Sequence, residues 1–367
     1  NESSKKLLDD DGKDYKTAFI PQMDLKKTIV PISKVLEELN DWYLKESKYD
    51  DKYFNKTKEE LEKTKNDSKK TVAYMVKEFE MKKSADAYAR ATTSKTGMLD
   101  MGQLHTYKYN DDIFAKVTTL PGAKNHGLVM FLDWSGSMSG NLKGTLNQLY
   151  NLIWFCKKVN IPFDVYAFTD LYRRYNDKET KIQKFRSGEL DVNDLRLLHF
   201  FSDKMKNNQE FNMMHNLYMI ASKWSYRDWR NDGYPYKCPN HYNLGGTPLN
   251  ASIVSAMQIV PEFKNSRGIQ KVHTVFLTDG SSNDLRKFVM FKRDENWIEG
   301  NEGVSNWYGN KTITTYIDKK TGNKSVSDKS SRQDQTEALL ELLRQKVSDM
   351  SLVNFFIAGS GRKGNVS

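Results

Sequence analysis

The chain has 367 residues with an apolar fraction of 38% and a charged fraction of 28%, enough for one large domain and a smaller one. Its apolar runs are too short to span a membrane, and no signal peptide opens the sequence. Its two cysteines make no disulfide framework. These features predict a cytoplasmic protein. The net charge of +10 comes from lysines without interleaved aromatic residues, so nucleic acid is not the expected partner.

The first quarter of the chain is predicted as an arm followed by helices. Residues 1–25 open with an acidic, lysine-rich stretch that has little to bury, which indicates a disordered or docking arm. Residues 26–104 are predicted as a helical N-terminal region, with one amphipathic helix after Pro31 and a longer helix from about 56 to 83. The longer helix has a thin apolar stripe, so we expect it to pack on another element, in this chain or in a partner.

Residues 92–117 are predicted as a turn, a short helix and an extended entry into a main domain that covers residues 105–367. Strands are predicted in that domain at 128–132, 163–168, 272–278 and 352–358, and helices at 141–160, 192–224, 245–260 and 336–350. Strands that alternate with helices of this length predict an α/β fold with a Rossmann-like, doubly wound, mainly parallel sheet.

Two insertions interrupt this alternation. A loop near 225–243 is rich in tryptophan and tyrosine, and a polar segment spans 293–332. Within the polar segment, two β-rich runs at 312–317 and 324–326 flank the Gly-containing stretch KKTGN, a pattern that predicts a β-hairpin.

Three short motifs carry oxygen side chains at predicted strand ends or strand-to-helix loops. Asp133, Ser135 and Ser137 follow the first strand, Thr247 lies in the loop GGTPL, and Asp279 follows a later strand in LTDG. In an open parallel sheet, ligands bind at the C-terminal edge of the strands. Carboxylate and hydroxyl oxygens suit a hard divalent cation such as Mg²⁺ or Mn²⁺, and helix capping does not account for three such motifs together.

In this order, the motifs resemble the metal-ion-dependent adhesion site of von Willebrand factor A domains, whose five positions are all filled here. The resemblance implies that the two serines bind the cation (Mg²⁺, Mn²⁺ or Ca²⁺) directly. It implies that Thr247 binds directly or through water, and that Asp133 and Asp279 mostly hold ligated waters. An Asp or Glu carboxylate of a protein partner then completes the coordination, so the implied role is binding and not catalysis.

Within that superfamily, residues 97–104 (GMLDMGQL) and 193–196 (NDLR) are similar to the von Willebrand factor A subunit of aerobic cobaltochelatase and to related partners of MoxR-type AAA+ ATPases. This resemblance covers about residues 90–360 and implies an adaptor or regulatory partner of a hexameric AAA+ ATPase. The chain departs from the chelatase subunits in its GGTPL motif, its insertions and its lack of a long acidic run. A chelatase subunit and a basic nucleic-acid-associated protein are the alternatives, and the polar insertions are compatible with a phage-encoded relative.

Four residues are candidate partner contacts around the predicted cation: Trp134, Gly246, Trp229 and Tyr236. The alternative for the aromatic loop is that it packs on the domain's own surface. Cys238 and His241 are not expected to bind zinc, because no second pair of ligands accompanies them. The G-x-G-x-x-G at 359–364 follows the last strand instead of the first, so it is not expected to bind a dinucleotide.

Overall fold

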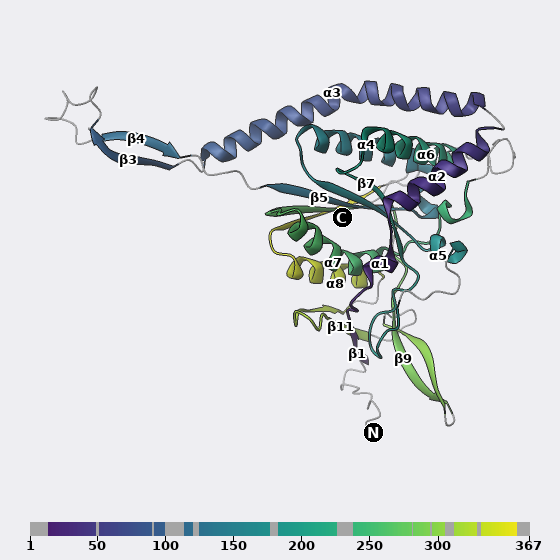
Figure 1. The fold of residues 1–367 in the computed structure, drawn as a ribbon. Helices are drawn as coiled ribbons and strands as arrows, with labels where there is room; N and C mark the ends of the chain where they lie inside the picture. Colours follow the sequence, from purple (N-terminus) through teal and green to yellow (C-terminus); the bar gives the residue numbers. More distant parts are fainter. Residues whose placement is uncertain are drawn as a thin grey trace.

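The computed structural model describes residues 14–48, 51–89, 92–99, 114–119, 125–176, 183–225, 238–280, 282–293, 296–304, 312–328 and 332–357. They form a mixed α/β fold in which helices lie on both faces of a six-stranded sheet (Figure 1). None of the helices in these ranges combines the length and the apolar character that a bilayer span requires.

The central sheet is mixed, with strand order β13-β8-β5-β6-β7-β2. Its strands are β2 (Ile29–Val30), β5 (His126–Asp133), β6 (Phe163–Thr169), β7 (Arg196–Ser202), β8 (Lys271–Thr278) and β13 (Met350–Phe356). β5 pairs in parallel with both β6 and β8, and β13 pairs in parallel with β8. Only the β6–β7 pairing in this sheet is antiparallel, so most of the sheet runs in one direction, as predicted.

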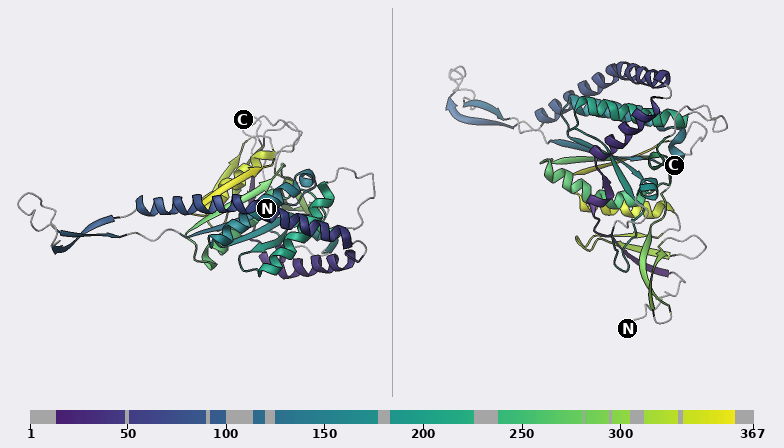
Figure 2. Two further views of the ribbon diagram at one scale, coloured as in Figure 1. Left: turned by 90° about the horizontal axis from the view of Figure 1, so that it is seen from above. Right: turned by 45° about the vertical axis from the view of Figure 1, so that its right-hand side comes forward.

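Two layers of helices enclose the sheet. One face carries α4 (Leu142–Lys158), α6 (Asn207–Ser225) and α2 (Ile32–Glu46), and α3 (Asp51–Ala89) lies across α4 and α6 (Figures 1 and 2). The other face carries α7 (Leu249–Ser266) and α8 (Arg332–Lys346). Successive side chains of β5 point to opposite faces of the sheet and so pack against the two helix layers in turn. Met130 and Leu132 belong to the core under α4 and α6, whereas Val129 and Phe131 belong to the core under α7 and α8.

The N-terminal helical region is built into this fold. β2 is an edge strand of the central sheet, and Leu36, Leu39 and Phe54 belong to the same buried core as β5 and α4. Further along α3, the ring of Phe79 lies 5.6 Å from that of Phe155 on α4, edge to face. The thin apolar stripe of α3 therefore packs within the chain. This buried core therefore includes residues from both sides of the predicted boundary between residues 104 and 105.

At the end of the predicted arm, β1 (Asp14–Phe19) pairs in parallel with β11 (Thr312–Ile317), and residues 1–13 lie outside the described residues. Two predictions about the elements are wrong. Residues 92–99, where a turn and a short helix were expected, form strand β3 (Thr92–Leu99), which pairs antiparallel with β4 (Phe114–Thr119) in the predicted extended entry. The helix predicted from residue 192 begins only at Asn207, because the apolar run RLLHFFS is the buried strand β7.

The hairpin predicted around KKTGN is confirmed. β11 pairs antiparallel with β12 (Lys324–Ser327), and Gly322 in the turn has a φ of +77°, a conformation that glycine adopts without strain. A second hairpin, which sequence analysis missed, pairs β9 (Arg286–Arg293), just before this insertion, with β10 (Asn296–Gly303) inside it. It projects away from the central sheet (Figure 1). Charged, Asn and Gly residues in these two strands weaken the usual strand pattern.

We predict that Phe54→Ala lowers the free energy of unfolding by about 3–5 kcal/mol, because it empties a core position shared with α2. Phe54 is 1% exposed and packs edge-on against Tyr43, with ring centroids 5.2 Å apart. Chemical denaturation would measure the change. Tyr74→Ala on the same helix is the control, since that side chain is 64% exposed and its loss should cost less than ~0.5 kcal/mol. Equal stability of Phe54→Ala and wild type would mean that α3 is not part of this core.

Candidate metal centre

The central strand β5 ends in a buried carboxylate, Asp133. Its Oδ2 accepts a hydrogen bond of 2.6 Å from Thr278 Oγ1 at the end of β8, whereas Oδ1 has no hydrogen-bond partner in the part of the chain described. Burial raises the pKa of Asp133 to about 6. Hydrogen bonding from Thr278 and Ser135 opposes this shift, and the nearby charge of Asp279 adds to it. A buried acceptor oxygen left without a donor fits a position that a cation would satisfy.

The two serines continue this cluster. They flank the start of a short 3₁₀ helix, η2 (Gly136–Gly140), which follows β5. Ser135 Oγ lies 2.9 Å from Ser137 Oγ, and Ser137 Oγ donates to Asp279 Oδ1 at 2.7 Å. Asp279 follows β8, which runs parallel to β5, so both strands end at the same edge of the sheet. The structure thus brings four of the five predicted ligands together.

The loop that carries the fifth, Thr247, is attached to the serine loop through backbone hydrogen bonds. Gly136 N donates to Gly245 O at 2.8 Å, and Gly245 N donates to Trp134 O at 3.3 Å. These two bonds form an isolated parallel bridge between Ser135 and Gly245. Thr247 is almost fully buried two residues further on. The five predicted positions therefore lie on adjoining loops.

Asp170 anchors the Gly-Gly turn and was missed by sequence analysis. Its Oδ1 accepts from Gly246 N at 2.8 Å, and its Oδ2 accepts from Arg174 at 2.9 Å. A Cβ atom on Gly245 would collide with Asp170 and Leu171, so the turn can approach this closely only with glycine. A signal was present in the sequence, because Asp170 ends its strand as Phe-Thr-Asp, much as Asp279 ends in Leu-Thr-Asp.

Of the four predicted partner contacts, the structure describes only Trp134 and Gly246. Trp134 is fully buried and its Nε1 donates to Tyr242 O at 2.8 Å, so the indole joins two loops and is not available to a partner. This corrects its predicted role, which rested on its position between Asp133 and Ser135. Gly246 uses its N–H to bind Asp170. Trp229 and Tyr236 lie outside the described residues.

Glu38 on α2 connects the N-terminal region to the same loops. Tyr242 OH donates to its Oε2 at 2.7 Å, Tyr172 OH on α5 (Leu171–Asn176) donates to its Oε1 at 3.0 Å, and His241 Nε2 lies 3.4 Å from Oε2. Burial raises the pKa of Glu38, but His241, Tyr242 and Tyr172 together outweigh burial and hold the pKa below its ordinary value. An ionised Glu38 therefore positions Tyr242, whose carbonyl in turn holds Trp134.

The cluster differs from a metal site built of ionisable side chains. In the described ranges no group of three or more His, Cys, Asp or Glu side chains is placed to hold a metal, so the cluster is distinguished by its hydroxyl groups.

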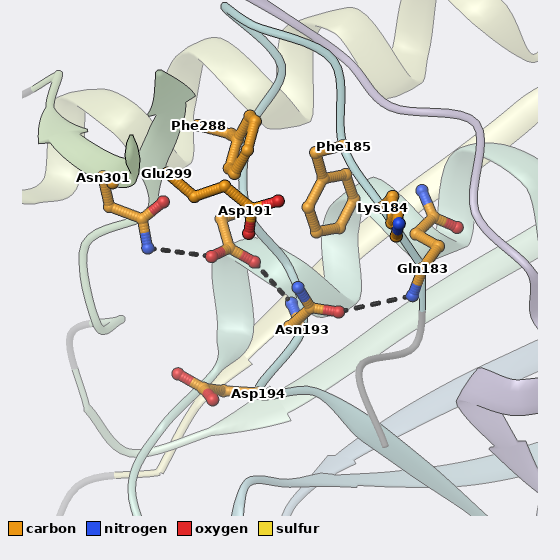
Figure 3. Close-up of a pocket in the computed structure, with 10 residues that line it drawn as sticks. Gln183, Lys184, Phe185, Asp191, Asn193, Asp194, Phe288, Glu299 and Asn301 are labelled. Carbon is orange, nitrogen blue, oxygen red and sulfur yellow. Dashed lines mark hydrogen bonds between the residues drawn. The ribbon is translucent and has the colours of Figure 1, made fainter. Parts of the chain in front are cut away.

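A separate cavity of about 320 Å³ lies where residues 183–194 meet the β9–β10 hairpin (Figure 3). Phe185, Phe288 and Asp191 line it, and Asn301 Nδ2 donates to Asp191 Oδ2 at 2.9 Å. It shares no residue with the hydroxyl cluster.

Comparisons with known proteins give little more. No protein-family model matches the chain, and no curated protein matches its sequence. Among solved structures, the pilus adhesin SpaC from Lactobacillus rhamnosus GG, in an open conformation, is 12% identical with a TM-score of 0.35, over 64% of this chain and 24% of that one. Three N-terminal domains of the type V pili tip protein Mfa5 from Porphyromonas gingivalis are 10% identical with a TM-score of 0.25, over 53% and 27%. The chain thus matches about a quarter of each, and likenesses this weak carry no functional argument.

We predict that Asp133→Asn stabilises the cation-free protein at pH 7.5. The pKa of this carboxyl is about 3.8 in the unfolded chain and about 6 in the folded protein, so its protonation favours folding below pH 4 and that contribution is lost as the pH rises through 6. Two pKa units correspond to roughly 3 kcal/mol, so Asn should raise Tm by about 2–6 °C in EDTA at pH 7.5 and by much less at pH 4. Calorimetry at both pH values checks this, and Asp67→Asn, at an exposed position on α3, is the control that should leave Tm nearly unchanged. A lower Tm at pH 7.5 would contradict it.

We predict that Glu38→Gln loosens the loop at residues 238–247, because a neutral amide accepts weaker hydrogen bonds from Tyr172 and Tyr242 than a carboxylate does. Hydrogen–deuterium exchange of that loop should be roughly tenfold faster, the equivalent of about 1.4 kcal/mol of local opening. Glu37→Gln, an exposed neighbour on the same helix, is the matched control. Unchanged exchange in Glu38→Gln would mean that α2 does not position this loop.

Proposed function

We propose that the chain is a non-catalytic, cation-dependent protein-binding module of the von Willebrand factor A kind, with a doubly wound sheet. The observation that supports it best is the connected cluster at the end of β5 and β8, where Ser135, Ser137 and Asp279 form a chain of hydrogen bonds beside the orphaned Asp133 oxygen. Parallel strands that deliver oxygen ligands to one edge, with helices on both faces, support the same fold assignment.

In this proposal Ser135 and Ser137 bind Mg²⁺ or Mn²⁺, or alternatively Ca²⁺, through their hydroxyls. Thr247 binds it directly or through a water, and Asp133 and Asp279 hold ligated waters. When bound, the cation would attract an Asp or Glu carboxylate of a protein partner. The residues of the chain do the rest: Asp170 and the two glycines hold Thr247 in place, and Trp134 and Tyr242 lock the two loops together.

The proposed partner is a hexameric MoxR-like AAA+ ATPase, for which this chain acts as adaptor or regulator. Support for the ATPase is the sequence resemblance at 97–104 and 193–196 together with the cation site. In the structure, residues 193–195 precede β7, and Arg196, its first residue, is buried with Nη1 donating to Leu195 O at 2.9 Å. This stretch therefore shapes the entry to a core strand, so partner contacts would come from surfaces around the cation.

We predict that Mg²⁺ or Mn²⁺ raises Tm of the wild-type protein, since a ligand at 100 times its Kd stabilises the folded state by about 2.7 kcal/mol. Ser137→Ala and Thr247→Val should remove most of this rise, because each deletes one hydroxyl ligand. Ser139→Ala, in the same η2 turn, is the matched control and should keep the rise. A cation-dependent rise that survives in Ser137→Ala would refute the assigned ligand set.

Affinity capture would identify the partner. It would compare the wild-type protein with Ser137→Ala, each in Mg²⁺ and in EDTA. Retention of an AAA+ ATPase only with wild type and Mg²⁺ supports the adaptor proposal. An ATPase retained equally in EDTA would mean that the cation site does not mediate the contact. Capture of nucleic acid alone, with steep salt dependence, would favour the basic nucleic-acid-associated alternative.

A further inference from the structure

A groove lies between α3, α4 and α6 on the outer helical layer, away from the metal centre. Its cavity volume is about 660 Å³. Apolar side chains from all three helices line it, and they are Val72 and Ala73 of α3, Trp154 of α4, and Phe211 and Met214 of α6. Val72 and Met214 are buried, whereas Trp154 and Phe211 are half-buried and so leave part of their apolar surface open to the groove.

Lysines surround this apolar floor. Lys65 and Lys69 come from α3, and Lys157 and Lys158 from the last turn of α4. Lys157 is paired with Glu210 at 2.6 Å, the one acidic residue among the described lining residues. The other three lysines are exposed and form no salt bridge within the ranges that the structure describes. Four lysines against one glutamate leave a local excess of three positive charges.

The groove is independent of the proposed cation site. α4 begins directly after η2, and Trp154, Lys157 and Lys158 lie near its other end. At 1.5 Å per residue, the distance along α4 from Leu142 to Lys157 is roughly 22 Å. None of the five predicted metal ligands lines the groove.

We propose that this groove binds an acidic amphipathic helix of a protein partner. Lys65, Lys69 and Ala73 are spaced four residues apart on one face of α3, so the two charges repeat with each helical turn and the small alanine allows close approach. A partner helix with carboxylates at the same spacing would place them against the lysines and its apolar face on Trp154 and Phe211. Trp154 and Phe211 offer half-buried apolar faces, and Glu210 in the same lining takes up one of the four lysines and disfavours a continuous phosphate backbone. A helix with one apolar face and separated carboxylates therefore fits the groove better than a nucleic acid.

The test uses a designed, labelled 18-residue probe with leucines on one helical face and glutamates on the other, measured by fluorescence anisotropy. Three comparison probes separate the contribution of charge from that of apolar contact. They are the same peptide with Gln for Glu, a polyglutamate of equal length, and an oligo-dT of equal charge. The variants are Lys65→Glu/Lys69→Glu and the matched control Lys63→Glu/Lys70→Glu, which changes the same charge at exposed α3 positions outside the groove. Lys158→Glu tests the α4 side of the groove separately.

Wild type should bind the acidic amphipathic peptide about tenfold more tightly than either peptide control, because charge and apolar contact act together. Lys65→Glu/Lys69→Glu should weaken binding about tenfold and Lys158→Glu about threefold, with the control pair within about twofold. The probe should bind with the same affinity in EDTA and to the Ser137→Ala variant. A failure of the groove proposal can therefore be told apart from a failure of the cation-site proposal. Tighter binding of oligo-dT, equal binding of all probes, or equal losses in both lysine pairs would overturn the proposal.

Discussion

A fully buried carboxylate at the end of the central strand is the constraint around which this edge of the molecule is arranged. Asp133 follows the β5 residues that pack into the apolar cores on both faces of the sheet, and it accepts a hydrogen bond of 2.6 Å from Thr278. A buried charge is costly unless it is paired or coordinated, and the raised pKa of Asp133 reflects that cost. A bound cation would offset the charge of Asp133, which would explain why a carboxylate is buried where these two loops meet.

Three neighbouring parallel strands each end in an aspartate, and the three have different surroundings. Asp133 ends β5 in the core, Asp170 follows β6 and anchors a backbone amide, and Asp279 follows β8 and accepts a bond from Ser137. The parallel direction of the strands brings all three to one edge. Their roles differ because the loops beside them differ, which residue type alone does not reveal.

The N-terminal helices give this edge a second layer of support. Glu38 reaches from α2 to Tyr172 and Tyr242, and through the Tyr242 carbonyl to Trp134 beside Asp133. α3 lies across α4 and α6 and supplies two of the lysines of the apolar groove. α4 thus has the candidate cation site at its N-terminal end and the groove near its C-terminal end, so one helix connects the two surfaces for which we propose different partners.

Local sequence pattern predicted the elements with strong signals. The apolar runs of β5, β6 and β8 and the hairpin around KKTGN were placed within a few residues. The weak points were segments whose local pattern is ambiguous. RLLHFFS reads equally well as part of a helix, and only its pairing with β6 makes it a strand. β1 is short, and it is a strand because the distant β11 completes its hydrogen bonds. β9 is paired by β10, whose charged, Asn and Gly residues give little strand signal.

The sequence by itself determined the mixed α/β character and the five hydroxyl and carboxylate positions, because apolar periodicity and motif spacing are local properties. Only the tertiary structure decided that Trp134 is buried, that Asp170 holds the glycine turn, and that Glu38 belongs to the same network. The reason is physical. Burial and hydrogen bonding depend on which distant segments meet, and Glu38 and Tyr242 are separated by 204 residues of chain before the fold brings them together.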